Sequence, residues 1–140
     1  MKILIKKLRP EAIIPSYAHP GDSGLDLYSL DEYELQPGER RLFFLGFALE
    51  FPAGYVATVK DKSSLPKNAG LHTMGGVFDC GFRGEYNVML INLGDQPYKI
   101  LTGDKIAQLV ILPVAQAELE ETTELNDSSR GLGQFGSTGR

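Results

Sequence analysis

Short apolar runs separated by turn residues dominate the chain, and they predict β-strands rather than helices. ILIKKL near the N-terminus alternates loosely, and residues 33–51 give two short β-like runs around the Pro37-Gly38 turn. Further strands are predicted within residues 54–61 and 85–94, and two more flank the turn at residues 102–104. The stretch IAQLVILPV is apolar enough for a buried helix, but its β-branched residues and closing proline favour a strand.

Only one segment predicts a helix. SSLPKNAGL, residues 63–71, has room for one or two helical turns, opened by Ser63 or Ser64 as the cap. Many short strands with closely spaced turns predict an all-β domain, either a sandwich, a jelly roll or a small barrel. We assign this domain to residues 1–120. Residues 121–140 have few apolar anchors and many Gly, Ser and Thr residues, so we expect a flexible C-terminal segment there.

Composition excludes several classes of function. A chain of 140 residues fits one domain, and a formal net charge of -4 gives no general basic face for a nucleic-acid polymer. No apolar run is long enough for a membrane span, and the first residues lack the apolar core of a signal peptide, so we expect a cytoplasmic protein without membrane association. The single Cys80 excludes an internal disulfide, and His19 and His72 lack metal-ligand spacing.

Two polar clusters near the strands have both an ordinary and a chemical interpretation. In SGLDLYS, Asp26 would face away from its leucine neighbours, either as a solvated strand position or as a carboxylate that holds the water shell of Mg²⁺. In DKSSLP, the side chains of Lys62, Ser63 and Ser64 follow a strand. They either cap a helical turn or donate hydrogen bonds to phosphate oxygens.

Two later clusters raise the same choice. GGVFDCGFRGEY, residues 75–86, ends a strand-like run with Asp79, which is either a turn cap or a catalytic base. RGLGQFGSTG lacks the GK[ST] and the strand–loop–helix context of a P-loop NTPase. It is either a disordered terminus or a lid, in which Arg130 offers charge to phosphate, Phe135 a ring for base stacking, and Ser137 and Thr138 hydroxyl donors.

Taken in order, five clusters resemble the five motifs of the trimeric deoxyuridine triphosphatases, the dUTP diphosphatases. SGLDLYS, DKSSLPKNAGL, GGVFDCGFRGEY, GDKIAQL and RGLGQFGSTG match motifs one to five, over residues 21–139. The resemblance implies a distorted jelly-roll β-barrel that assembles as a homotrimer, with active sites at subunit interfaces and the fifth motif as a lid. It also implies Mg²⁺ as cofactor and hydrolysis of dUTP to dUMP and pyrophosphate, by water attack on the α-phosphorus.

The same resemblance implies a role for each site residue. Asp79 would be the general base, and Ser63 would hydrogen-bond the phosphate oxygen on which leaving-group charge develops. Gly76 would face the uracil edge, Phe82 would pack on the deoxyribose, and Asp26 would hold metal-bound waters. The other substrate contacts would come from Lys62, Ser64, Gln108, Arg130, Phe135, Gly136, Ser137 and Thr138.

The chain departs from the commoner motif wording at four positions: it has Lys62 for Arg, Phe82 for Tyr, Gly81 for a second acid and Gln134 for Gly. Two alternatives remain beside dUTP hydrolysis. A dCTP deaminase shares the fold but needs a catalytic acid where NVMLIN has Met89. A non-catalytic module that binds nucleotides for regulation is the other alternative, because a fold alone does not determine a function.

Overall fold

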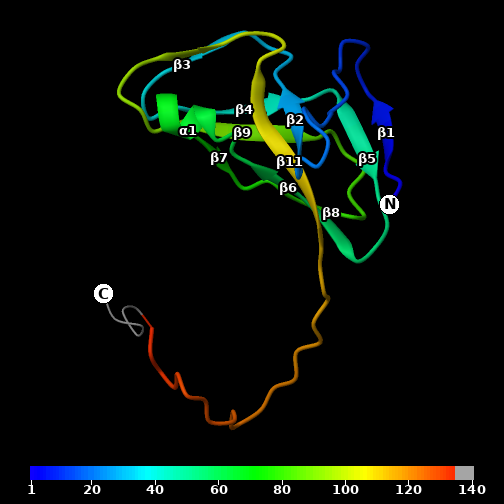
Figure 1. Ribbon diagram of the computed structural model, residues 1–140, viewed down its shortest axis with the longest axis vertical. Helices are drawn as coiled ribbons and strands as arrows, with labels where there is room; N and C mark the ends of the chain where they lie inside the picture. Colours follow the sequence, from blue (N-terminus) through cyan, green and yellow to red (C-terminus); the bar gives the residue numbers. More distant parts are fainter. Residues whose placement is uncertain (135–140) are drawn as a thin grey trace.

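Antiparallel strands make up nearly all of the computed structural model, which describes residues 1–134 (Figure 1). Within that range the chain forms eleven strands and one short helix. In chain order they are β1 Leu4–Lys7, β2 Gly24–Tyr28, β3 Tyr33–Leu35, β4 Arg40–Phe44, β5 Phe47–Glu50, β6 Tyr55–Lys60, α1 Ser64–Ala69, β7 Leu71–Met74, β8 Val77–Asp79, β9 Asn87–Asn92, β10 Tyr98–Ile100 and β11 Lys105–Pro113. The predicted all-β class is confirmed.

Two larger sheets and two strand pairs build the body of the molecule. One sheet has the order β2-β11-β6-β8 and the other β4-β9-β7, while β1 pairs with β5 and β10 with β3. The long β11 lies between β2 and β6, so that Gln108 is opposite Asp26 on one side and Lys60 on the other. The register thus aligns three polar residues from distant parts of the sequence in one row.

One apolar core is shared by strands of all four sheets. On β9 the burial alternates residue by residue, with Val88 and Leu90 directed inward. This period of two is the pattern of a strand with one face on a core. The core also contains Leu27 from β2, Leu35 from β3, Phe43 from β4, Phe47 from β5, Ala57 from β6, Leu71 from β7, Phe78 from β8, Ile100 from β10 and Leu109 from β11. Contributions from every sheet to one core are what a closed jelly-roll barrel requires.

The predicted elements hold with one exception, and the strand β7 at Leu71–Met74 was not predicted. IAQLVILPV lies in β11, and α1 is the single short helix expected in residues 63–71. Residues 33–51, however, contain three strands and not two, because the apolar run RRLFFLGFALEF bends at Gly46 and continues in a different sheet. Apolar continuity alone does not reveal such a change of sheet, since both strands are buried in the same core.

The segment after β11 leaves the barrel. Residues 114–134 contain no helix or strand, and in Figure 1 they run away from the sheets. Their exposed side chains include Leu119 and Leu125. The described part of the chain has no helix that is long and apolar enough to span a membrane.

Candidate active site

A buried carboxylate between two lysines lies at one end of the β2-β11-β6-β8 sheet. Lys62 Nζ is 2.7 Å from Oδ1 of Asp26, and Lys105 Nζ is 2.6 Å from Oδ2. We call Asp26, Lys62 and Lys105 the lysine cluster. Asp26 comes from β2, Lys62 from the loop after β6, and Lys105 from the first position of β11. The strand order brings these three elements together.

Burial and charge act in opposite directions on Asp26. The residue is only 3% exposed, so the prediction of a solvated strand position is wrong. Burial favours the neutral carboxyl group, but the hydrogen bonds and charges of Lys105 and Lys62 outweigh it and lower the pKa of Asp26 from its ordinary 3.8. The carboxylate is therefore ionised at neutral pH and partly neutralises the two ammonium groups.

The loop from Asp61 to Ser64 presents polar groups next to the lysine cluster. Ser63 is in the N-cap position of α1, yet its side chain makes no capping hydrogen bond, so the prediction of a hydroxyl cap is wrong for Ser63. Both serines are exposed. Gln108 on β11 donates from Nε2 to the Asp61 carbonyl oxygen at 2.8 Å. Hydroxyl, amide and ammonium groups thus gather at this end of the sheet, a donor set that suits phosphate oxygens.

The segment from Gly75 to Tyr86 forms a second polar region. Gly75 and Gly76, with φ of 67° and 82°, carry the chain from β7 in one sheet to β8 in the other. The Val59 N–H donates to the Gly76 carbonyl at 2.7 Å, and a β-carbon at Gly76 would lie 2.7 Å from Val59 Cβ. This corner therefore requires glycine for both its conformation and its close approach to β6.

Asp79 ends β8 with an exposed side chain. Its carbonyl accepts a hydrogen bond from the Phe82 N–H at 3.0 Å, which closes the following turn. Within residues 1–134 its carboxylate makes no hydrogen bond, so the described structure gives no support to a side-chain turn cap. Asp79 lines a hollow of about 330 Å³ together with Val77, Cys80 and Val114.

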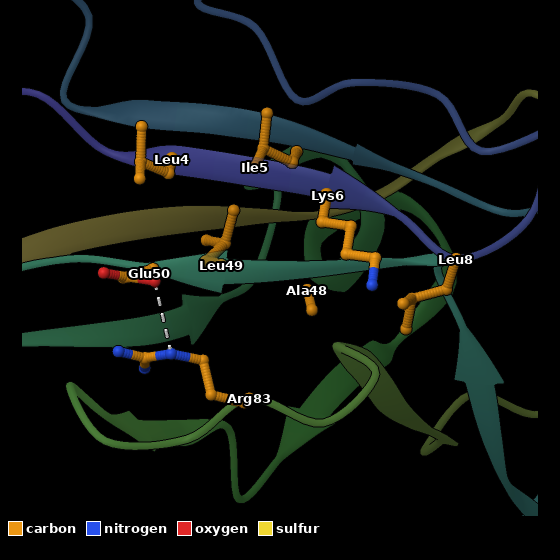
Figure 2. A pocket seen from close by; sticks show the side chains of 8 residues that line it. All are labelled: Leu4, Ile5, Lys6, Leu8, Ala48, Leu49, Glu50 and Arg83. Atoms are coloured by element: carbon orange, nitrogen blue, oxygen red, sulfur yellow. Dashed lines mark ion pairs between the residues drawn. The ribbon is translucent and has the colours of Figure 1, made fainter.

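Aromatic packing holds Phe82 beside this turn. Its ring lies 5.6 Å from that of Phe78 and 5.8 Å from that of Tyr86, and a β-carbon at Gly84 would lie only 2.5 Å from its Cζ. The residue as a whole is still 37% exposed. The next residue, Arg83, reaches Glu50 on β5 at 3.6 Å, and both line a separate hollow beside the paired strands β1 and β5 (Figure 2). The aromatic core thus anchors Phe82, which remains partly exposed.

One chain does not bring Asp79 to the lysine cluster. Asp79 on β8 is opposite Val56 of β6, whereas Gln108 on β11 is opposite Lys60 of β6. Lys60 is four positions after Val56, which places Asp79 about 13 Å along the strand from the row of Gln108 and Asp26. In Figure 1, α1 lies at the left of the barrel and β8 lies to its right, at the other end of β6. Arg130 in the tail donates to the carbonyls of Gly133 and Gln134, within its own segment. The predicted lid residues Phe135, Gly136, Ser137 and Thr138 lie outside the described residues.

The described side chains by themselves form no cluster of metal ligands. Residues 1–134 contain no group of three His, Cys, Asp or Glu side chains that could hold a metal ion. Asp26 is the carboxylate of the lysine cluster, and both of its oxygens face ammonium groups. Mg²⁺ needs few protein ligands when it is bound together with phosphates, because it keeps most of its water shell.

Comparison with known proteins decides the family. The dUTPase family model matches residues 10–139. The chain belongs to the dUTPase family. Curated relatives named deoxyuridine 5'-triphosphate nucleotidohydrolase include one from Clostridium kluyveri, 43% identical over 99% of both chains. Another from Nautilia profundicola is 42% identical over the full length of both.

Solved dUTPase structures share the fold over nearly the whole chain. The dUTPase of Staphylococcus bacteriophage 80alpha with dUpNHpp has a TM-score of 0.93 at 27% identity and covers 99% of each chain. A phage phi11 dUTPase mutant, described with a structural Mg(II) ion, has a TM-score of 0.84 at 24% identity, covering 91% of this chain and all of its own. The dUTPase jelly roll is therefore established for this chain.

Two sets of contacts around the lysine cluster were not predicted from the sequence. Lys105 pairs with Asp26, although GDKIAQL had indicated only Gln108. The Asp61 carboxylate contacts Thr73 and His72. From the same motif the sequence had indicated only Lys62, Ser63 and Ser64, as phosphate contacts. The available signal was the position of Lys105 and Asp61 at the ends of predicted strands, but the register between those strands is not visible in the sequence.

Proposed function

We propose that this dUTPase hydrolyses dUTP to dUMP and pyrophosphate, which lowers the dUTP level and supplies dUMP for thymidylate synthesis. The observation that carries this proposal is the dUTPase family match across residues 10–139, which includes all four motif segments of the described barrel. Relatives at 42–43% identity over essentially the full length carry the corresponding enzyme name. The exposed donors near the lysine cluster and the exposed Asp79 are consistent with that chemistry.

One half of the active site binds the phosphates, and it is formed by the lysine cluster and the loop before α1. Lys62, Ser63, Ser64 and Gln108 donate to the phosphate oxygens, and Ser63 bonds the oxygen that bridges the α- and β-phosphates. Negative charge grows on this oxygen as its bond to the α-phosphorus breaks, so a donor here stabilises the transition state more than the substrate. The exposure of both hydroxyls supports this assignment, because they are available to a ligand.

Asp79 supplies the general base in the second half of the active site, which contacts the attacking water and the nucleoside. Its carboxylate accepts a proton from a water molecule, whose oxygen forms a bond to the α-phosphorus while the bond to the bridging oxygen breaks and pyrophosphate leaves. Gly76 presents backbone groups to the uracil edge. Phe82 packs on the deoxyribose, where its ring leaves no space for a 2′-hydroxyl; the anchoring by Phe78 and Tyr86 supports a fixed ring.

The two halves have to come from different copies of the chain. The α-phosphorus and the bridging oxygen are bonded to each other, so Asp79 and Ser63 must act within a few ångströms. In one chain, Asp79 is four residues of β6 away from the row of the lysine cluster. We therefore assign the protein to a homotrimer in which Asp79 of one copy faces Lys62 and Ser63 of another.

Mg²⁺ is the cofactor that we assign to this reaction, bound mainly by the triphosphate. Asp26 would hold its waters from the side of the protein, which requires Lys62 or Lys105 to release one of the two carboxylate oxygens that they occupy. When bound, the ion neutralises charge on the phosphates. Positioning of the phosphates by Lys62, Ser63 and Gln108 is the part that the chain itself contributes.

The tail completes the site as a lid. Arg130 binds the γ-phosphate, Phe135 stacks on uracil, and Gly136, Ser137 and Thr138 contact the triphosphate. The course of residues 114–134 supports this, because the tail runs away from its own barrel and is not packed on it. We assign the activity to the cytoplasm, since its charged substrate and product are retained by membranes.

Pyrophosphate release from each deoxynucleoside triphosphate with Mg²⁺ tests the function. We expect turnover with dUTP and little with dCTP or dTTP, and Asp79→Asn should lower kcat by at least about 100-fold while the circular dichroism spectrum stays unchanged. If the wild-type protein releases no pyrophosphate from dUTP, the proposed enzymatic function is refuted. Formation of dUTP from dCTP would instead support the deaminase, although Met89 on β9 offers no acid for it.

A further inference from the structure

Asp61 ties three parts of the structure together at the end of β6. Its Oδ1 accepts hydrogen bonds from the backbone N–H of Thr73 at 2.6 Å and from the Thr73 hydroxyl at 2.8 Å. Its Oδ2 lies 2.7 Å from His72 Nδ1. Because β6 and β7 belong to different sheets, these bonds fasten the end of β6 to β7, an outer strand of the other sheet.

The main chain of Asp61 holds a second element. Its carbonyl oxygen accepts the 2.8 Å hydrogen bond from Gln108 Nε2. On its other side the Gln108 amide lies against Gly24, where a β-carbon would be 2.0 Å from Gln108 Oε1. The amide is thus fixed between β2 and the loop after β6, and its orientation depends on where Asp61 lies.

We infer that Asp61 is a positioning residue for phosphate binding, which acts through the Gln108 amide and through the loop that carries Lys62 and Ser63. This inference rests on the proposed function, because it concerns the same phosphate-binding groups. Asp61 directly precedes this loop, so fixing its side chain to Thr73 and its carbonyl to Gln108 limits where the next two residues lie. Asp61 itself does not contact the substrate.

The ionisation of Asp61 is consistent with this role. Burial favours the neutral form, but hydrogen bonds from the Thr73 backbone, from His72 and from the Thr73 hydroxyl outweigh it and lower the pKa of Asp61. A carboxylate accepts bonds without donating any, so it suits a position that faces a hydroxyl and a backbone N–H together. Its side chain is 25% exposed, which distinguishes it from a core residue.

Two measurements test the inference: the steady-state kinetics of dUTP hydrolysis, and the affinity for dUpNHpp measured by calorimetry. Both are made well below the unfolding temperature of each variant. Asp61→Ala should lower kcat/KM by about 10- to 100-fold and weaken dUpNHpp binding, because small displacements of positioning groups have effects of that size. Asp61→Asn keeps an acceptor for Thr73 and should recover to within about threefold of wild type. Asp31→Ala is the matched control: the Asp31 carboxylate pairs with Arg41 and with none of the proposed phosphate-binding groups, so both quantities should stay unchanged.

A double-mutant cycle separates positioning from general stability. If Asp61 acts through the amide, Asp61→Ala should have a smaller effect in a Gln108→Ala background than in wild type. An Asp61→Ala enzyme within about twofold of wild type, or an Asp61→Asn variant as impaired as Asp61→Ala, would overturn the inference. Additive effects in the cycle would overturn the part of it that runs through the Gln108 amide. Failure of the proposed function looks different, because the wild-type protein itself would then release no pyrophosphate from dUTP.

Discussion

Replacing Asp26 with Asn tests how much the lysine cluster contributes to folding. The substitution keeps the size of the side chain but removes the charge that lies 2.7 Å from Lys62 Nζ and 2.6 Å from Lys105 Nζ. Two ammonium groups are then left close together at the end of one sheet. We expect a clear loss of stability even without any nucleotide.

The exposure of the partners determines the magnitude. Removing one member of a fully buried ion pair costs about 3–5 kcal/mol, and a surface pair contributes about 0–1 kcal/mol. The Asp26 side chain is 5% exposed, but those of Lys62 and Lys105 are 32% and 41% exposed, so solvent screens the lysine side. An intermediate loss of about 2 kcal/mol follows, or about 6 °C in the midpoint of thermal unfolding for a domain of this size.

Urea unfolding followed by circular dichroism measures the loss, at one fixed protein concentration because assembly contributes to stability. Asp31→Asn is the control: it also removes one charge, but from the exposed pair with Arg41, and should cost at most about 1 kcal/mol. If the two variants differ from each other by less than about 0.5 kcal/mol, the lysine cluster is not a significant source of stability.

The pH dependence gives a second check on Asp26. Its pKa in the folded protein is below the ordinary 3.8, so its stabilisation is fully present above about pH 4 and is lost as the pH falls through the folded value. The difference between wild type and Asp26→Asn should therefore be constant from about pH 8 to 5 and shrink below about pH 4. A difference that does not change down to pH 2 would refute the assigned charge effect.

Two further predictions concern the segment from Gly75 to Tyr86. The Tyr86 hydroxyl is buried without a hydrogen-bond partner among the described residues, and burial raises its pKa to about 12. Tyr86→Phe should therefore stabilise the protein by about 1 kcal/mol in urea unfolding, and a destabilised variant would indicate a partner for the hydroxyl. Gly76→Ala adds a clash with Val59 to the strain of its positive φ, whereas Gly75→Ala meets no atom within 4 Å, so Gly76→Ala should lower the midpoint of unfolding more. Equal losses would show that contact with β6 does not constrain this corner.

Part of the site was accessible from local sequence because its chemistry lies in short segments. The run of Lys62, Ser63 and Ser64 after a strand indicated phosphate donors, and both hydroxyls are exposed in the structure. By contrast, the alternation of apolar and polar residues along β2 was misleading for Asp26, because it allowed a solvated side chain where the structure has a buried one. Its side of β2 is covered as well, because Lys62 and Lys105 arrive there from two other segments. A pattern of period two reports which residues share a face and not what covers that face.

The sequence by itself determined the all-β class, most of the strands, the one short helix and the order of five motifs that mark a dUTPase. These features depend on neighbouring residues, whose turn chemistry and alternation are local. Only the tertiary structure decided that Lys105 pairs with Asp26, that Asp61 fastens β6 to β7, and that Asp79 lies about 13 Å along β6 from the row of Gln108. Strand order and register set these distances, and they follow from how the whole chain buries its core rather than from any single segment.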